Sequence, residues 1–403
     1  MIDSKCGTCH ADGNIAPFAM TTYAEVAALV NILPSAIESR SMPPWPPEAG
    51  CNEYRHDRSL SEGEEELLTT WLADGAPEGD PADEPAAEER ADTDDDFVAD
   101  VTLTMAEPYT PVTAPDEYRC FVLPWEEEAP YVTGFRVLPG QPSIVHHVIA
   151  FAVEPDQVEQ VQALDAADEG PGYPCFGGSG VPRTRWIGTW APGGGAEVYP
   201  AQTGVRLDPG SLVVMQIHYN TAVSAPIADS TSIEMTVAEA VERPLLNQAI
   251  LDPGWVFGTE PMEIPAGDPD VTHSVEVDLS AAPWSDLLSE IGIAEGEDVL
   301  VHAAGLHMHQ LGVRSELRLL RAGAEEECMV KIPAWDFGWQ GSYEFTTPMR
   351  IRKGDKLSLQ CWWDNSESHQ PIIDGKLLDP IDVGWGEGTR DEMCIATLRL
   401  SRP

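Results

Sequence analysis

Basic residues are scarce in this 403-residue chain. Only 23 lysines and arginines stand against 68 aspartates and glutamates, which gives a formal net charge of -45. So acidic a protein repels polyanions and offers no basic stripe for phosphate groups. We therefore expect neither nucleic acid nor an anionic membrane surface as a partner. The acidic excess itself is most economically a solubilising or salt-adapted surface rather than a specific site.

Long apolar runs and two common catalytic motifs are also missing. The chain has no stretch of about 18 apolar residues, so we expect no membrane-spanning helix. It contains neither a phosphate-binding G-x-x-x-x-G-K-S/T loop nor a G-x-S-x-G nucleophile elbow, which leaves hydrolase functions with little support. No basic and apolar leader precedes Cys6. We expect that any export signal has been removed or was never present.

Cysteine is sparse, but its placement is informative. Of the eight cysteines, two lie in the C-x-x-C-H motif at Cys6 to His10, and the other six are widely spaced. An even number of spaced cysteines is compatible with disulfides in an oxidising compartment. Covalent haem attachment is an extracytoplasmic process in bacteria as well, so we expect a periplasmic or secreted bacterial protein.

The chain divides by composition into a helical start, an acidic linker and a long β-rich part. Apolar residues at helical spacing, with Ser59 or Ser61 as an N-cap, predict a small helical domain over residues 1–80. Residues 81–96 combine proline, alanine and acid without periodicity, which indicates an extended linker. Beyond them, short β-type runs between Gly, Pro, Asp and Asn turns predict two β-sandwiches, over residues 97–243 and 244–403. The expected fold class is mostly β with a small α-helical N-terminal domain.

The C-x-x-C-H motif predicts one covalently attached haem c. Cys6 and Cys9 would form thioethers to the haem vinyl groups, and His10 would coordinate the iron. Met42, in the proline-rich loop SMPPWPP, is the expected second axial ligand, with Met20 as the fallback. Ligation by histidine and methionine suits electron transfer. The alternatives are a zinc site or a thiol redox pair at the cysteines, and a core role for Met42. The segment also resembles small c-type cytochrome domains, with which it shares CxxCH, APF, MPPW and GAP.

Five histidines lie in three short groups that are far apart in the sequence. His307 and His309 are two residues apart, so on a strand both imidazoles leave the same face and can share a metal ion. His146 and His147 are adjacent and need a bulge or a strand end to do the same. His218 lies at the end of an apolar run. Imidazoles with an added thioether favour copper, although each histidine taken singly is more simply a hydrogen-bonded interior residue.

Four motifs, PSIVHHVIAF, VVMQIHYN, LHMHQLG and DEMC, occur in the order found in the copper type II monooxygenases, the family of peptidylglycine α-hydroxylating and dopamine β-monooxygenases. Residues 97–403 resemble this family. The resemblance implies two jelly-roll-like sandwiches that face each other across a solvent-filled cleft, with one copper on each. It implies that the copper that passes on an electron is held by His146, His147 and His218. It implies that the catalytic, dioxygen-binding copper is held by His307, His309 and Met393.

The resemblance also implies two disulfides, Cys120 to Cys175 and Cys361 to Cys394. Cys51 and Cys328 are left over. Either they pair, which would staple the haem domain onto the copper region, or they are free or partner-linked thiols.

Three positions depart from the peptide-processing members of that family. Gly305 stands where those members have an arginine that grips the substrate carboxylate. Ile395 and Thr397 stand where they have asparagine and tyrosine. We therefore do not expect a peptide with a C-terminal glycine as the substrate. His302, which falls in no motif, is expected to be structural.

Together these features predict a dicopper monooxygenase that hydroxylates a C–H bond of a small organic substrate with O2. Electrons would pass from an external donor, either an ascorbate-like reductant or a redox protein, to the tethered haem, then to the three-histidine copper and finally to the methionine copper. The alternative is a non-catalytic periplasmic haem and copper protein that transfers electrons or binds copper.

Overall fold

The chain folds into two compact units that interleave in sequence. The first contains residues 1–46 and 56–98, and the second contains residues 47–55 and 99–403. The computed structural model describes residues 1–7, 9–11, 16, 18–80, 97–175, 177–191, 194–222, 224–373, 376–388 and 390–403. The acidic linker expected at 81–96 lies outside the described residues. Within the described part, no helix is both long and apolar enough to cross a membrane.

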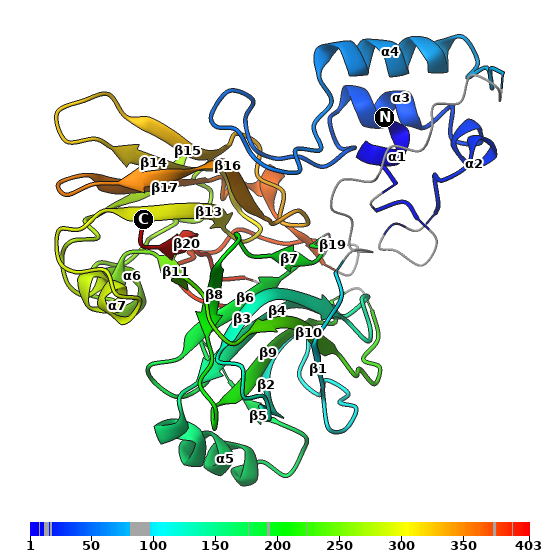
Figure 1. The fold of residues 1–403 in the computed structure, drawn as a ribbon. Coiled ribbons are helices and arrows are strands. Elements are labelled where there is room, and N and C mark those ends of the chain that lie inside the picture. Colours follow the sequence, from blue (N-terminus) through cyan, green and yellow to red (C-terminus); the bar gives the residue numbers. More distant parts are fainter. Residues whose placement is uncertain are drawn as a thin grey trace. The chain divides into compact units, whose positions relative to one another are not determined.

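The first unit is helical. Its helices are α1 (Ile2–Lys5), α2 (Tyr23–Ala27), α3 (Leu33–Glu38) and α4 (Glu62–Ala73). Ser61 caps α4, because its hydroxyl accepts from the backbone of Glu64 while the Glu64 carboxylate accepts from the backbone of Ser61. Helices α3 and α4 lie side by side (Figure 1) and bury Ile37, Leu68 and Leu72 between them.

The N-terminal part of the second unit is a sandwich of two β-layers. Its strands are β1 (Val101–Thr104), β2 (Asp116–Pro124), β3 (Tyr131–Leu138), β4 (Val145–Val153), β5 (Tyr173–Pro174), β6 (Arg185–Trp190), β7 (Glu197–Val198), β8 (Thr203–Arg206), β9 (Leu212–Asn220) and β10 (Ser232–Ala238). The layer β5-β2-β9-β4-β6 packs on the layer β1-β10-β3-β8. Apolar residues of both layers, such as Phe121, Ile217, Phe135 and Ile233, form one buried core. The 3-10 turn Pro155–Gln157 and helix α5 (Val158–Ala167) follow β4.

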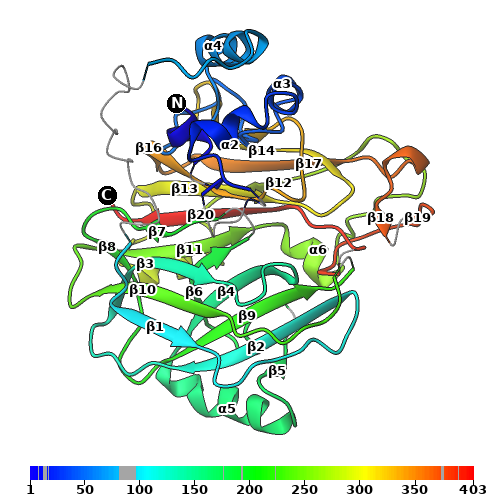
Figure 2. The same cartoon turned by 90° about the vertical axis from the view of Figure 1, so that its right-hand side faces the viewer.

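The C-terminal part adds a second pair of layers. Its elements are β11 (Arg243–Ile250), α6 (Pro253–Phe257), β12 (Val271–Val277), α7 (Trp284–Glu290), β13 (Val299–His307), β14 (Gly312–Leu320), β15 (Glu327–Ile332), β16 (Ser342–Ile351), β17 (Lys356–Trp363), a 3-10 turn (Glu367–His369), β18 (Ile372–Ile373), β19 (Lys376–Leu377) and β20 (Ile395–Ser401). One layer is β12-β17-β14-β15, and the other is β16-β13-β20-β11. Figure 2 shows β13 and β20 between the β14 and β17 layer and the first sandwich.

Strand β11 joins the two sandwiches. Its first residues, Arg243 to Leu245, pair with β8, Asn247 pairs with Trp186 of β6, and its last residues pair with β20. The division that the sequence predicts between residues 243 and 244 falls at the start of this shared strand. The mostly β fold class is confirmed, and the shared strand makes the two sandwiches one continuous body.

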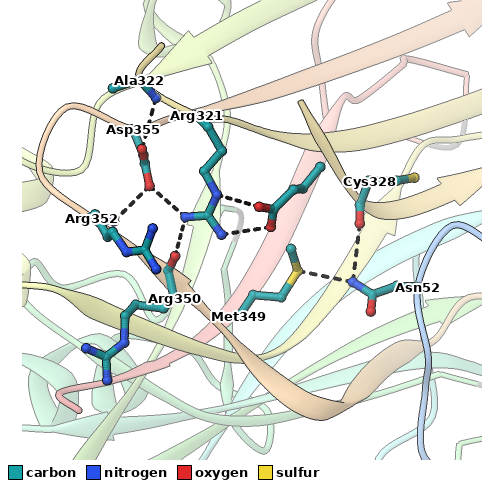
Figure 3. Close-up of polar contacts among 9 residues, drawn as sticks. Asn52, Arg321, Ala322, Cys328, Met349, Arg350, Arg352 and Asp355 are labelled. Carbon is teal, nitrogen blue, oxygen red and sulfur yellow. Dashed lines mark hydrogen bonds and ion pairs between the residues drawn. The ribbon is translucent and has the colours of Figure 1, made fainter. Parts of the chain in front are cut away.

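The short segment 47–55 belongs to the second unit although both of its flanks belong to the first. Cys51 forms a disulfide with Cys328 of β15, and Tyr54 pairs with Phe345 of β16. The Asn52 amide donates to the Cys328 carbonyl, beside a network of ion pairs around Arg321 (Figure 3). Of the two alternatives for Cys51 and Cys328, the structure therefore has the pair, and it fastens this segment to the C-terminal sandwich. The other disulfides are Cys120–Cys175 and Cys361–Cys394.

Candidate metal centres

Three histidines of the first sandwich converge on one point. His146 and His147 belong to β4 and His218 to the neighbouring β9, and one ring nitrogen from each lies within 4.8 Å of the other two. His147 stands opposite His218 in the ladder, and the register shifts between Val145 and His147. This is the bulge that adjacent histidines need in order to share a face, so that requirement is confirmed.

The hydrogen bonds of this cluster show which ring nitrogens face the common point. His218 Nε2 lies 2.9 Å from Asp116 Oδ1 and donates to it, while the buried Nδ1 has no hydrogen-bond partner among the described residues. The Nδ1 atoms of His146 and His147 are 3.3 Å apart. A buried ring nitrogen without a partner is costly unless it coordinates a ligand. The cluster therefore presents Nδ1 atoms to a metal ion.

Aromatic packing and burial hold the three rings in place. Tyr118 stacks on His218 with ring centroids 4.2 Å apart, and its hydroxyl donates to the Glu387 carbonyl at 2.6 Å. Burial lowers the pKa of His146 to about 3 and the pKa of His147 well below its usual value. Both rings are therefore neutral at pH 7, and neutral imidazole is the form that binds metal ions.

The second histidine pair lies where β13 ends. The rings of His307 and His309 have centroids 5.1 Å apart. His307 Nδ1 donates to Gln340 Oε1 at 2.5 Å, and His309 Nδ1 donates to the Asp391 carbonyl at 2.8 Å. Both Nε2 atoms are therefore left as possible ligands, whereas the first cluster presents Nδ1 atoms. Burial also lowers the pKa of His307 to about 3 and that of His309 to about 4.

Met393 belongs to the same locality. The chain meets His309 at Asp391 and pairs with His307 at Ile395, so Met393 lies on the short connection between the two contacts. Its side chain is buried, and the next residue, Cys394, is fixed by its disulfide. The backbone thus brings the expected sulfur ligand to the second histidine pair.

Glu392 organises the second centre, and the sequence did not single it out. Its buried carboxylate accepts from the backbone N–H of His309 at 2.9 Å, from that of Leu311 at 2.6 Å and from Trp363 Nε1 at 2.9 Å. Burial raises the pKa of Glu392 to about 7. One side chain thus ties the His309 turn and Trp363 of β17 to the connection that carries Met393. The signal available in the sequence was a charged residue directly before Met393, the expected copper ligand.

Phe337 is the second residue that the sequence did not reveal. It lies between β15 and β16, and its ring stacks on His146 at a centroid distance of 4.8 Å and meets His309 at 6.0 Å. Gln340 Nε2 donates to the Phe337 carbonyl at 2.9 Å. One loop therefore contacts both centres. Sequence patterns could not find it, because AWDFGWQGSYEF resembles any aromatic core segment.

The first unit carries the C-x-x-C-H motif, of which the structure describes Cys6, Gly7, Cys9 and His10. Cys6 and Cys9 lie outside the three disulfides. His10 is buried, and its Nδ1 donates to the Phe18 carbonyl at 3.0 Å, which leaves Nε2 for a metal ion. Met20 is buried, whereas Met42 is half-buried in its proline-rich loop.

Two further positions behave as the sequence suggests. A Cβ at Gly305 would lie 2.7 Å from Thr397 Oγ1 and 2.9 Å from the Gly341 carbonyl, so this position has no room for an arginine. His302 is buried apart from both centres with its Nε2 2.8 Å from Ser401 Oγ, which agrees with a structural role.

Two family models match this chain, and they describe the two domains of one protein family. The model of the N-terminal domain of copper type II ascorbate-dependent monooxygenases matches residues 101–225, and that of the C-terminal domain matches residues 288–399. The DBH-like monooxygenase protein 2 of Mus musculus is 23% identical over 369 residues, which cover 84% of this chain and 53% of the mouse protein. The chain thus spans about half the length of that relative.

Solved structures add little. The major capsid protein P2 of Bacteriophage PM2 is 9% identical over 75% of this chain and 97% of its own, with a TM-score of 0.27. The infectious bursal disease virus VP2 subviral particle is 10% identical over 75% of this chain and 71% of its own, with a TM-score of 0.19. Scores this low support no argument about the fold.

Proposed function

Because the chain belongs to the copper type II ascorbate-dependent monooxygenases, we propose that it is a dicopper enzyme that hydroxylates a C–H bond of a small organic substrate. The overall reaction is R–H + O2 + 2 e⁻ + 2 H⁺ → R–OH + H2O. When bound, copper supplies one-electron redox chemistry and the activation of dioxygen. The observation that carries the proposal is the presence of two histidine sets in one unit, in which hydrogen bonds fix His218, His307 and His309 at the ring nitrogen that faces away from the proposed metal.

The ligand assignments follow from these sets. His146, His147 and His218 would hold the electron-transferring copper through Nδ1. His307 and His309 would hold the catalytic copper through Nε2, with the thioether of Met393 as third ligand. A soft sulfur donor favours Cu(I), and nitrogen donors hold Cu(II), so both sets suit an ion that changes oxidation state.

Three acceptors orient these ligands. Asp116 fixes the His218 ring, Gln340 fixes the His307 ring, and the Asp391 carbonyl fixes the His309 ring. Acceptors of this kind set the tautomer and raise the basicity of the ligating nitrogen. They preorganise the histidine ligands for metal binding.

We extend the proposal to the first unit, where residues 1–80 would form a c-type cytochrome domain. Thioethers at Cys6 and Cys9 and ligation by His10 and Met42, with Met20 as the fallback, would hold one haem c. When bound, haem supplies a one-electron carrier between an external donor and the copper centres. The motif and the His10 hydrogen bond support this assignment.

The domains of the chain and its compartment follow from the same assignment. Residues 81–96 would be a linker, and residues 97–243 and 244–403 would be two jelly-roll-like copper domains. The external donor would be an ascorbate-like reductant or a redox protein. Three disulfides fit an oxidising compartment, in keeping with a periplasmic or secreted bacterial protein.

Elemental analysis of the purified full chain tests the proposal. We expect two coppers and one haem iron per chain. His218→Ala and His307→Ala should each lose one copper and keep the other, whereas His302→Gln, the control at a buried histidine outside both centres, should keep both. Loss of both coppers in either alanine variant, or of neither, would contradict two separate centres.

Oxygen uptake separates the two candidate functions. The reduced, copper-loaded protein should consume O2 together with substrate and release an oxygenated product in equal amount. Uptake with no oxygenated product across a substrate panel favours the alternative, a non-catalytic haem and copper protein. Met42→Ala should change the optical spectrum of the haem, and an unchanged spectrum would mean that Met42 is not the axial ligand.

A further inference from the structure

Segment 47–55, which we call the strap, lies along two edge strands of the C-terminal sandwich. Strand β15 is the last strand of the layer β12-β17-β14-β15, and β16 ends the other layer, where it pairs with β13. An edge strand has backbone N–H and C=O groups that its own sheet leaves without a partner. The strap supplies partners on both strands, although the chain on either side of it belongs to the first unit.

Backbone hydrogen bonds fix the two ends of the strap on different strands. The Glu48 N–H donates to the Lys331 carbonyl of β15 at 2.7 Å. The Lys331 ammonium donates in turn to the Glu48 carboxylate, whose nearer oxygen lies at 2.7 Å. At the other end, the Arg55 N–H donates to the Glu344 carbonyl of β16 at 2.8 Å. The strap therefore begins on one layer of the sandwich and ends on the other.

Two residues in the middle of the strap each contact both strands. Tyr54 pairs with β16 through its backbone, while its buried hydroxyl donates to the Met329 carbonyl of β15 at 2.8 Å. The Asn52 amide donates to the Cys328 carbonyl of β15 at 3.2 Å and to the Met349 sulfur of β16 at 3.1 Å (Figure 3). Each of these side chains therefore holds the two layers together at their edge.

The two strands that the strap joins are connected by loop 333–341, which contacts the candidate metal centres. Gln340 in this loop accepts the hydrogen bond that orients His307. Trp335 Nε1 of the same loop donates to the His309 carbonyl at 3.1 Å. The position of the loop therefore decides how both histidines of the second centre are held.

The strap holds this loop close to both of its ends. Lys331 lies two residues before the first residue of the loop, and Glu344 lies three residues after its last. The loop contains Gly338 and Gly341, whose backbones are less restricted than those of other residues. Fixing both ends of such a loop leaves it fewer conformations, so the entropy cost of keeping Gln340 in place is smaller.

We propose that the strap is a positioning element for the second metal centre, because it holds loop 333–341 at both ends and so keeps Gln340 against His307. The inference rests on the copper centres of the proposed function and adds a remote determinant of copper affinity. Tyr54 and the Cys51–Cys328 disulfide are its positioning groups. They act through the loop and not on the metal ion.

The variant Tyr54→Phe tests the proposal in the full chain. It removes the hydroxyl that binds β15 and keeps both the ring and the backbone pairing with β16. The loss of one hydrogen bond should release the loop for part of the time. We expect Cu(I) affinity, measured against a competing chelator, to fall about three- to tenfold at the second centre and about twofold or less at the first.

A second variant and a matched control accompany this measurement. The double variant Cys51→Ser, Cys328→Ser removes the covalent attachment and should lower the copper affinity of the second centre at least as much. Tyr23→Phe removes a similar bond in the first unit, from the hydroxyl to the Ala76 carbonyl at 2.9 Å, and should change neither affinity. Unchanged affinity at the second centre in both strap variants would overturn the proposal.

A double-mutant cycle shows whether the strap acts through Gln340. In the Gln340→Leu background the loop no longer orients His307, so Tyr54→Phe should change the copper affinity of the second centre by less than about twofold. An equally large fall in both backgrounds would overturn the assignment, because Tyr54 would then act on the centre by another route.

Hydrogen exchange in the metal-free protein gives a readout that does not depend on copper. The Trp335 N–H of the loop donates to the Val313 carbonyl at 2.9 Å. We expect peptides that contain the loop to exchange about two- to tenfold faster in Tyr54→Phe than in the wild type, and peptides from β4 to exchange equally. Unchanged exchange of the loop would overturn the role of the strap whatever the copper content. Fewer than two coppers in the wild type would contradict the proposed function and leave this comparison intact.

Discussion

The two candidate copper centres are built in different ways. In the first, two adjacent strands supply all three histidines, so the ladder of β4 and β9 sets their positions. In the second, His307 ends a strand, His309 lies in a turn and Met393 comes from a separate connection. Their hydrogen bonds also differ, because the first centre presents Nδ1 and the second presents Nε2. The first centre is therefore preorganised by backbone pairing, and the second depends on side chains that tie loops together.

Substitution of Glu392 should have the largest effect, because this side chain ties together the loops of the second centre. We expect Glu392→Gln to lower the free energy of unfolding by about 2–4 kcal/mol. The glutamine amide has only one oxygen acceptor, and its NH2 group would face buried N–H donors that the carboxylate now accepts from. The copper of the second centre should be lost and the first retained. Denaturant unfolding and copper analysis at pH 8, above the Glu392 pKa of about 7, measure both effects.

Glu387→Gln is the matched control for this variant. Glu387 lies in the same connection, but among the described residues its carboxylate accepts from one backbone N–H, that of Gly177 at 2.6 Å. The control should keep both coppers and most of the stability. If Glu392→Gln keeps its second copper, then the loops of that centre hold together without the carboxylate, and the contrast between the two centres fails.

Each variant of an orienting acceptor should weaken copper binding at its own centre and leave the other centre unchanged. Asp116→Leu should weaken copper binding at the first centre about 10- to 100-fold, and Gln340→Leu should do so at the second, because each removes the acceptor that orients a ligating histidine. Each variant is the control for the other. Titration of Cu(I) against a competing chelator measures both affinities. A variant that weakens both centres equally would mean that they are not independent.

Much of this arrangement follows from sequence patterns alone. The i, i+2 spacing of His307 and His309 predicts one shared face, and a metal shared by the adjacent His146 and His147 requires a bulge or a strand end, of which the β4 to β9 register contains the bulge. The mostly β texture is likewise a local property. What local patterns cannot give is the identity of partners far away in the sequence, such as Glu392 with Leu311 or Phe337 with His146. The strand β11 shared by both sandwiches is equally a long-range feature.

His302 separates the effect of burial from that of metal binding. Burial and three nearby arginines lower its pKa to about 4, although it belongs to neither centre. As pH falls below about 6.5, His302 becomes protonated in the unfolded chain but stays neutral in the folded protein until about pH 4. The free energy of unfolding therefore falls across that pH range. His302→Gln should therefore flatten the acid side of the stability curve by up to about 1.4 kcal/mol per pH unit. Equal slopes in urea unfolding between pH 6.5 and 4.5 would show that the folded protein protonates His302 readily.

Phe337 offers the mildest test, because its ring meets one histidine ring of each centre. Phe337→Leu keeps an apolar group in place and removes the ring stacking, a loss of about 0.5–1.5 kcal/mol shared between the two contacts. We expect copper affinity to fall about threefold or less at each centre. Phe257→Leu, at an exposed ring of α6, is the control and should change neither affinity. If the copper affinity of the second centre alone falls, then Phe337 stabilises only its own loop, and the strand pairing is sufficient to position His146. If both affinities fall equally, then the position of His146 in the first centre also depends on a loop of the other sandwich.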